Sequence, residues 1–276
     1  MAPTSVPELF SKCHARIGRA VHHSNEAAEI WNGLDIMHLL AVTLFVRDDG
    51  TGTLDVDQVE PLPENLELEL GEYLYQLRAA LDGAVYASAI QDSDQNPPPK
   101  ASSIEFPICE SNEAWPRQSR KIALLNDGRR RFIEVTQPFA EPPLEASLMV
   151  LNSNRCLRFL NELARIDRHR RLHTLIAGIS MDRPLFELPE GARLEKLEVR
   201  PISSSEGPAA CFALTGWKRG MKLFANPLAE IDLWLEGLAA PCHSNDTLPH
   251  RLQSITMNVR MIVSFLEKNE WLPPSP

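Results

Sequence analysis

Apolar residues recur at helical spacing from about Asn65 to Ile90, and this long stripe limits the possible folds more than any other feature of the chain. At 100° per residue, one side of the segment carries Leu66, Leu70, Tyr73, Leu74, Leu77, Leu81, Ala84, Val85 and Ser88. A helix with one apolar side must bury that side against other elements. The stripe therefore predicts a long amphipathic helix at the centre of a helical layer.

Other segments show the same helical period. An amphipathic helix is predicted from Pro7 to about Gly33, and another over Leu248 to Lys268. The chain is expected to be mostly helical from Leu148 to about His173, with a short helix over Trp115 to Arg130. Several long helices are therefore expected.

Alternating and β-branched segments indicate strands. Residues His38 to Val46 and Thr53 to Val59 flank turn residues 48–52, which predicts a β-hairpin. Further strands are predicted at residues 193–200, 210–217 and 229–236. The predicted fold class is α+β, with several long amphipathic helices packed with an antiparallel β-sheet built from the hairpin and the strands after residue 190.

The chain has 276 residues, enough for one large domain or two small ones. Residues 92–103 are polar and contain three consecutive prolines, as in a loop or linker. We expect a single α+β domain over residues 1–276, and any subdivision would fall near this loop.

Composition excludes several classes of protein. The formal charge of −9 repels polyanions, so RNA or a nucleotide could bind only through a local basic patch. The five cysteines are scattered without a CxxC pair, as in reduced cytosolic proteins. No apolar run is long enough to cross a bilayer, and no phosphate loop or dinucleotide fingerprint is present. We expect a cytoplasmic protein with no membrane contact and no cofactor.

The segment from Arg155 to His173 carries six arginines against Glu162 and Asp167, a local charge of about +4. Helical projection centres its apolar face on four residues, which are Leu157, Leu160, Leu163 and Ala164. Asp167 and Arg171 fall on that face. Either they form an ion pair within the core, or they line a pocket in which Arg171 holds an anionic group.

His169 and His173 are four residues apart, a spacing at which a helix can present two imidazoles to a metal. The surrounding arginines would repel a divalent cation, and the segment lacks the glutamate of an HExxH motif. We therefore expect no metal site there.

The run from Arg168 to His173 has an arginine, a polar residue and a following histidine at the spacing of the HEPN motif. It resembles the HEPN superfamily, whose members are helical, often homodimeric and in many cases metal-independent ribonucleases. The resemblance implies Arg168 and His173 as a catalytic pair, with His169 as the polar residue after the arginine. In such a pair the histidine moves a proton and the arginine stabilises phosphorane-like charge.

A second resemblance covers more of the chain. The segments YQLRAALD (residues 75–82), FPI (106–108) and DRHR (167–170) resemble an uncharacterised bacterial protein family with an LRxALD, FPI and DxHR pattern. Gly83 stands where that family often has a histidine; if that histidine were the catalytic one, this chain would be a non-catalytic member. Arg78 and Asp82 are expected to form a helix-surface pair, or to join Asp167 and Arg171 in one polar cluster.

Arg129, Arg130 and Arg131 follow an Asn-Asp-Gly sequence and are expected in a solvated turn. Two function classes remain. One is a HEPN-like, RNA- or nucleotide-directed enzyme of the metal-independent ribonuclease kind, using Arg168 and His173. The other is a non-catalytic binding or interaction protein with an Arg–Asp structural polar core.

Overall fold

The computed structural model describes residues 4–140, 148–169, 174–179, 186–199, 207–225, 231–235 and 248–269. These residues form an α+β fold with long helices and a four-stranded antiparallel sheet, as the sequence predicts. The helices are α1 (Val6–Asn32), α2 (Ile36–Leu39), α3 (Glu64–Ser93), α4 (Trp115–Gln118), α5 (Asp127–Val135), α6 (Leu148–His169) and α7 (Leu248–Lys268), with 3-10 turns η1 (Ala101–Ser103) and η2 (Ser119–Ile122). No helix among the described residues is both long enough and apolar enough to span a bilayer.

The chain groups into two compact units. The first comprises residues 1–27, 68–171 and 251–276, and the second comprises residues 28–67 and 172–250. The proline-rich loop at residues 92–103 lies within the first unit. The single domain expected from the sequence stays a prediction.

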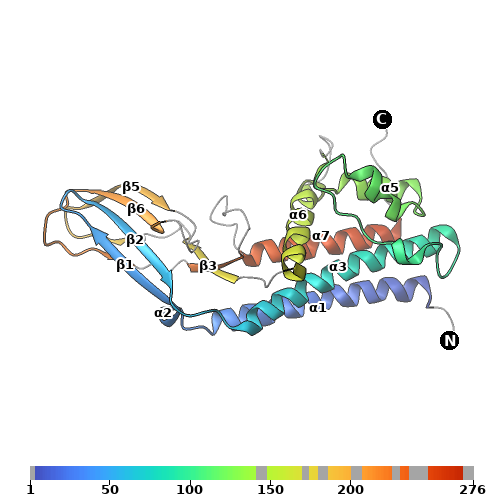
Figure 1. The fold of residues 1–276 in the computed structure, drawn as a ribbon, viewed down its shortest axis with the longest axis horizontal. Coiled ribbons are helices and arrows are strands. Elements are labelled where there is room, and N and C mark those ends of the chain that lie inside the picture. The colour runs from blue at the N-terminus through green and yellow to red at the C-terminus, as the bar shows by residue number, and fades with distance from the viewer. Residues whose placement is uncertain are drawn as a thin grey trace. The chain divides into compact units, whose positions relative to one another are not determined.

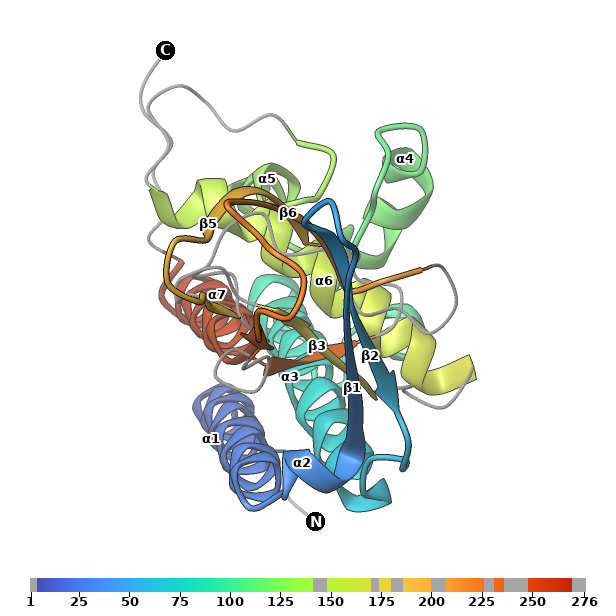
Figure 2. The same ribbon diagram turned by 90° about the vertical axis from the view of Figure 1, so that its left-hand side faces the viewer.

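In the first unit, α1, α3 and α7 run side by side (Figures 1 and 2). The predicted stripe of α3 is buried from Leu70 to Val85. At its centre the hydroxyl of Tyr73 donates a hydrogen bond of 2.7 Å to the carbonyl oxygen of Leu252 in α7. The apolar face predicted for α6 is also buried, at Leu157, Leu160, Leu163 and Ala164. Burial of these faces supplies most of the stability of such helices.

Polar side chains join the helices of this layer at its margins. His23 in α1 lies 2.7 Å from a carboxylate oxygen of Glu69 in α3, and His14 lies 2.8 Å from Glu267 in α7. Both histidines therefore pair with a carboxylate from a neighbouring helix.

The second unit is built on strands. These are β1 (Leu40–Val46), β2 (Thr51–Gln58), β3 (Thr174–Ile179), β4 (Phe186–Glu187), β5 (Arg193–Val199), β6 (Ala210–Thr215), β7 (Phe224–Ala225) and β8 (Ile231–Leu235). Four of them form one antiparallel sheet in the order β1-β2-β6-β5, so β1 and β5 are its edges among the described strands (Figure 1). The strands β3 and β8 pair with each other, as do β4 and β7.

One face of the four-stranded sheet is apolar. The register places Leu44 opposite Leu54, and Leu54 opposite Ala210, so these side chains share a face. This face buries Leu54, Ala210 and Phe212. The ring centroids of Phe186 and Phe212 lie 4.7 Å apart. The opposite face carries half-buried and exposed residues such as Thr53 and Lys196. The burial pattern of the sheet thus follows from strand alternation.

The structure differs from the prediction in several segments. The expected helix over Trp115 to Arg130 is interrupted, because Asn126 begins a new helix, with its side-chain oxygen accepting a hydrogen bond of 3.0 Å from the backbone N–H of Arg129. The strand β3 was not predicted. Its short apolar sequence carries no period that separates a strand from a buried helix.

Candidate functional site

Arg78 and Asp82 lie one turn apart on α3 and together hold the backbone of Phe106. A guanidinium nitrogen of Arg78 donates a hydrogen bond of 2.5 Å to the carbonyl oxygen of Phe106. The carboxylate of Asp82 accepts one of 2.8 Å from the N–H of the same residue. The two side chains are 3.6 Å apart, so the predicted pair exists. It fastens the FPI segment to α3, and the side chain of Phe106 is fully buried.

The surroundings of this pair are charged and half-buried. Burial raises the pKa of Asp82, and the neighbouring Arg78 guanidinium opposes that shift. Lys121 forms an ion pair with Glu105, next to the clamped residue. One nitrogen of Arg78, Nη1, is buried without a hydrogen-bond partner among the described residues. The other groups of this cluster pair with one another or with backbone, as in a structural polar core.

The position next to this pair is occupied by a packed glycine. A Cβ atom added at Gly83 would lie 2.9 Å from the sulfur of Cys13 in α1. A larger residue, such as the histidine of the LRxALDH pattern, would require Cys13 to shift. Gly83 thus has a packing role where α1 and α3 touch.

The side chains of the proposed catalytic pair are not among those that the structure describes. Arg168, His169 and Asp167 belong to the last turn of α6, but their side chains are not among those described. Arg171 and His173 lie outside the described residues altogether. The catalytic pair, and the joining of Arg78 and Asp82 with Asp167 and Arg171, stay predictions.

Arg129 contradicts the expectation of a solvated turn. Its side chain is 2% exposed and lies in α5, where the apolar residues Phe132 and Ile133 share its face. It donates hydrogen bonds of 2.9 Å to the carbonyl oxygen of Leu266, 2.5 Å to Asp92 and 2.6 Å to Gln91. Burial lowers the pKa of Arg129, and the carboxylate of Asp92 offsets that shift. Arg129 is thus a fully paired structural cation that joins α3, α5 and α7.

Two buried thiols, one in α1 and one in α6, do not suit nucleophilic chemistry. Cys13 and Cys156 are buried, and burial raises the pKa of each to about 11. The thiolate, which is the reactive form, is therefore scarce at neutral pH. No group of three metal-binding side chains occurs among the described residues either.

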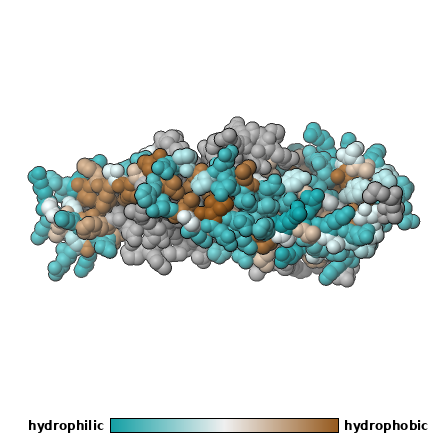
Figure 3. Space-filling view, turned by 90° about the horizontal axis from the view of Figure 1, so that it is seen from below, coloured by the Kyte–Doolittle hydropathy of each residue, from teal (hydrophilic) through white to brown (hydrophobic). Residues whose placement is uncertain are grey.

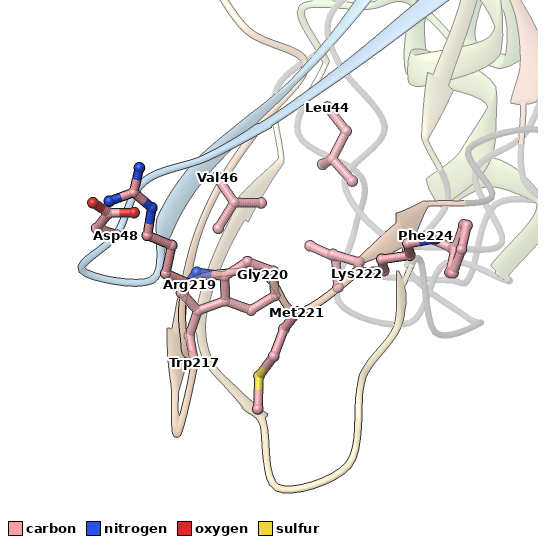
Figure 4. A pocket seen from close by; sticks show the side chains of 10 residues that line it. Leu44, Val46, Asp48, Trp217, Arg219, Gly220, Met221, Lys222 and Phe224 are labelled. Atoms are coloured by element: carbon pink, nitrogen blue, oxygen red, sulfur yellow. The ribbon is translucent and has the colours of Figure 1, made fainter.

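An open groove lined by described residues lies in the second unit. It has a volume of about 420 Å³ and lies between β1 and the loop that precedes β7. Its lining comprises Leu44, Val46, Asp48, Trp217, Arg219, Gly220, Met221, Lys222, Leu223 and Phe224. Leu44 and Val46 point from β1 into the groove, and Trp217 and Phe224 line its other sides (Figure 4).

The groove combines apolar side chains with polar backbone groups and a cationic rim. Phe224 is 59% exposed and Val42, on the same face of β1, is 37% exposed. In Figure 3 apolar residues, in brown, gather over the part of the view that the four-stranded sheet occupies in Figure 1. Arg219 and Lys222 are exposed and make no ion pair within the described part of the chain. Apolar walls with a few charged groups are typical of ligand sites.

Sequence reasoning missed this groove. Its two sides are about 170 residues apart in the chain and meet because Thr51 pairs with Ala213 across β2 and β6. The apolar strand at residues 40–46 and the basic residues of the loop after β6 are visible in the sequence, but their proximity depends on that pairing. The chain matches no protein-family model, no curated protein and no solved structure.

Proposed function

We propose that the protein acts by binding a protein partner in the groove beside β1, and that Arg78 and Asp82 belong to a structural polar core. The observation that carries this proposal is the groove itself, whose apolar walls include the exposed Phe224 and whose rim carries Arg219 and Lys222. Exposed apolar surface rimmed by charge is typical of protein interaction sites.

The polar contacts of the first unit support the same proposal. Arg78 and Asp82 hold backbone groups of Phe106, and Arg129 is neutralised by Asp92. Side chains held in this way are positioned to stabilise the fold, whereas a catalytic acid or base must reach a substrate. The HEPN-like activity of Arg168 and His173 remains the alternative proposal.

Photo-crosslinking tests the binding proposal. A photoreactive phenylalanine analogue placed at Phe224 is compared with the same analogue at Tyr75, since both residues are 59% exposed and Tyr75 lies on α3, far along the chain from the groove. After irradiation in the native cells, we expect a discrete adduct from position 224 and none from position 75. Adducts at both positions, or at neither, would contradict binding at the groove.

A further inference from the structure

The strand β1 has one edge that is unpaired among the described residues. It pairs with β2 and, among the described strands, with no other. The N–H of Arg47 donates to Thr51 at 2.7 Å, and the N–H of Val59 donates to Leu39 at 2.9 Å. Opposite residues in an antiparallel ladder alternate between hydrogen-bonded and non-hydrogen-bonded pairs. These two hydrogen bonds therefore fix the direction of every backbone N–H and C=O group of β1 between them. Leu40, Val42, Leu44 and Val46 therefore turn their N–H and C=O groups away from β2.

The residues with free backbone groups are also the residues that line the groove. Leu44 and Val46 point into it, and Val42 lies on the same face of the sheet. A further strand laid along β1 would bond to these residues and would place every second side chain beside them. Its alternate side chains would thus enter the apolar groove, against Trp217 and Phe224.

This edge lacks the features that usually prevent strand addition. Residues 40–46 contain no lysine, no proline and no charged residue, and the register with β2 runs without a bulge. Phe45, on the opposite face, is 53% exposed. An exposed apolar edge of this kind pairs readily with another chain.

The charges at the groove favour an acidic occupant. Arg219 and Lys222 at the groove outnumber its carboxylate, Asp48, on a chain whose formal charge is −9. A second β1 strand is followed by Arg47 as well as by Asp48 and Asp49, so it would bring less negative charge than a segment whose flanking charges are all carboxylates. A strand with a carboxylate at the groove would match the excess of positive charge.

We propose that the occupant of the groove is an extended peptide segment of a partner protein, which adds to β1 as a further strand. Alternate side chains of the segment are apolar and fill the groove, and an adjacent carboxylate lies against Arg219 and Lys222. This inference rests on the proposed binding function and specifies the class of ligand.

Two synthetic peptides test the inference by fluorescence anisotropy with the full chain. Both peptides contain four residues in which valine and threonine alternate. One peptide ends in two glutamates and the other ends in two lysines. We expect the glutamate peptide to bind at least tenfold more tightly. The double variant Arg219→Glu, Lys222→Glu should reverse this preference, because it reverses the sign of the rim. Arg193→Glu, on the exposed opposite edge strand β5, is the matched control and should change neither affinity.

Two further peptides test the backbone contact. Each is the glutamate peptide with N-methyl groups on one of the two sets of alternate amides, which removes hydrogen-bond donors without changing the charge. One of the two should bind at least tenfold more weakly than the parent peptide. Equal affinity of both methylated forms and the parent would overturn strand addition, and equal affinity of the glutamate and lysine peptides would overturn the role of the carboxylate.

The outcomes also separate this inference from the proposed function. If no peptide binds but Phe224 still yields an adduct with another protein, the peptide ligand is wrong and the binding function survives. If sedimentation shows a dimer that Val42→Lys dissociates, the occupant is a second copy, which also overturns the peptide proposal.

Discussion

Arg129 is the residue whose removal we expect to destabilise the first unit most among its charged residues. Arg129→Ala deletes the hydrogen bonds to Leu266, Asp92 and Gln91 and leaves the carboxylate of Asp92, itself 10% exposed, without its cation. Breaking a buried ion pair by removing one partner costs about 3 to 5 kcal/mol. We expect the free energy of unfolding, measured by urea denaturation, to fall by that order.

Arg131→Ala is the matched control, because Arg131 is two residues away and also pairs with a carboxylate, that of Glu134. Its side chain is 59% exposed, and exposed ion pairs contribute only about 0 to 1 kcal/mol. Equal losses in the two variants would show that burial of Arg129 does not decide its contribution.

The contrast between these arginines also shows what charge patterns conceal. Three consecutive arginines after Asn126 look alike as a charge run, and the run predicted a solvated turn. The position of Arg129 relative to Phe132 and Ile133, three and four residues later, could have placed it on the inner face of a helix. By contrast, the spacing of Arg78 and Asp82 predicted their pairing, but not the contact with Phe106, which depends on the path of the intervening loop.

At the scale of the elements, the hairpin turn between β1 and β2 borders the groove through Asp48. Gly50 has a positive φ of 83°, and a Cβ atom there would lie 2.4 Å from the carbonyl oxygen of Leu214 in β6. We expect Gly50→Ala to destabilise the sheet through both the strained backbone and this overlap. Positive φ alone costs an alanine about 1 to 2 kcal/mol, so the total loss in unfolding free energy should be larger.

Gly191→Ala separates the two causes. Gly191 has the same φ of 83°, but an added Cβ atom would meet nothing within 4 Å. Urea denaturation of the two variants should therefore show a smaller loss for Gly191→Ala, of about 1 to 2 kcal/mol. Equal losses of unfolding free energy in the two variants would show that close packing of the turn against β6 does not contribute to the effect of Gly50→Ala.

Long periodic elements were predictable and sites made by strand pairing were not. The stripe of α3 and the extent of α7, Leu248–Lys268, follow from apolar residues at helical spacing over many turns. The hairpin was predicted because its turn chemistry is local. The groove depends on the register that brings β6 beside β2, and no local pattern encodes a pairing between residues so far apart.

For the whole molecule, charge bears on the two function classes. The formal charge of −9 opposes a polyanion, and the basic segment of residues 155–173 is one part of the chain that could attract one. Two arginines of that segment have described contacts within the protein. Arg155 lies over the ring of Phe159, and Arg158 donates a hydrogen bond to the carbonyl oxygen of Pro138.

We therefore expect no RNA cleavage by the protein. Wild type and His173→Ala are incubated with mixed RNA at low salt, where electrostatic attraction is strongest, and with EDTA, so that only metal-independent cleavage is observed. RNA should remain intact with both, because the binding proposal assigns no chemistry to Arg168 and His173. Cleavage by wild type that His173→Ala abolishes, with the unfolding midpoint unchanged, would instead establish the HEPN-like alternative. Equal cleavage by both proteins would indicate a contaminating nuclease and would leave Arg168 and His173 without a catalytic role.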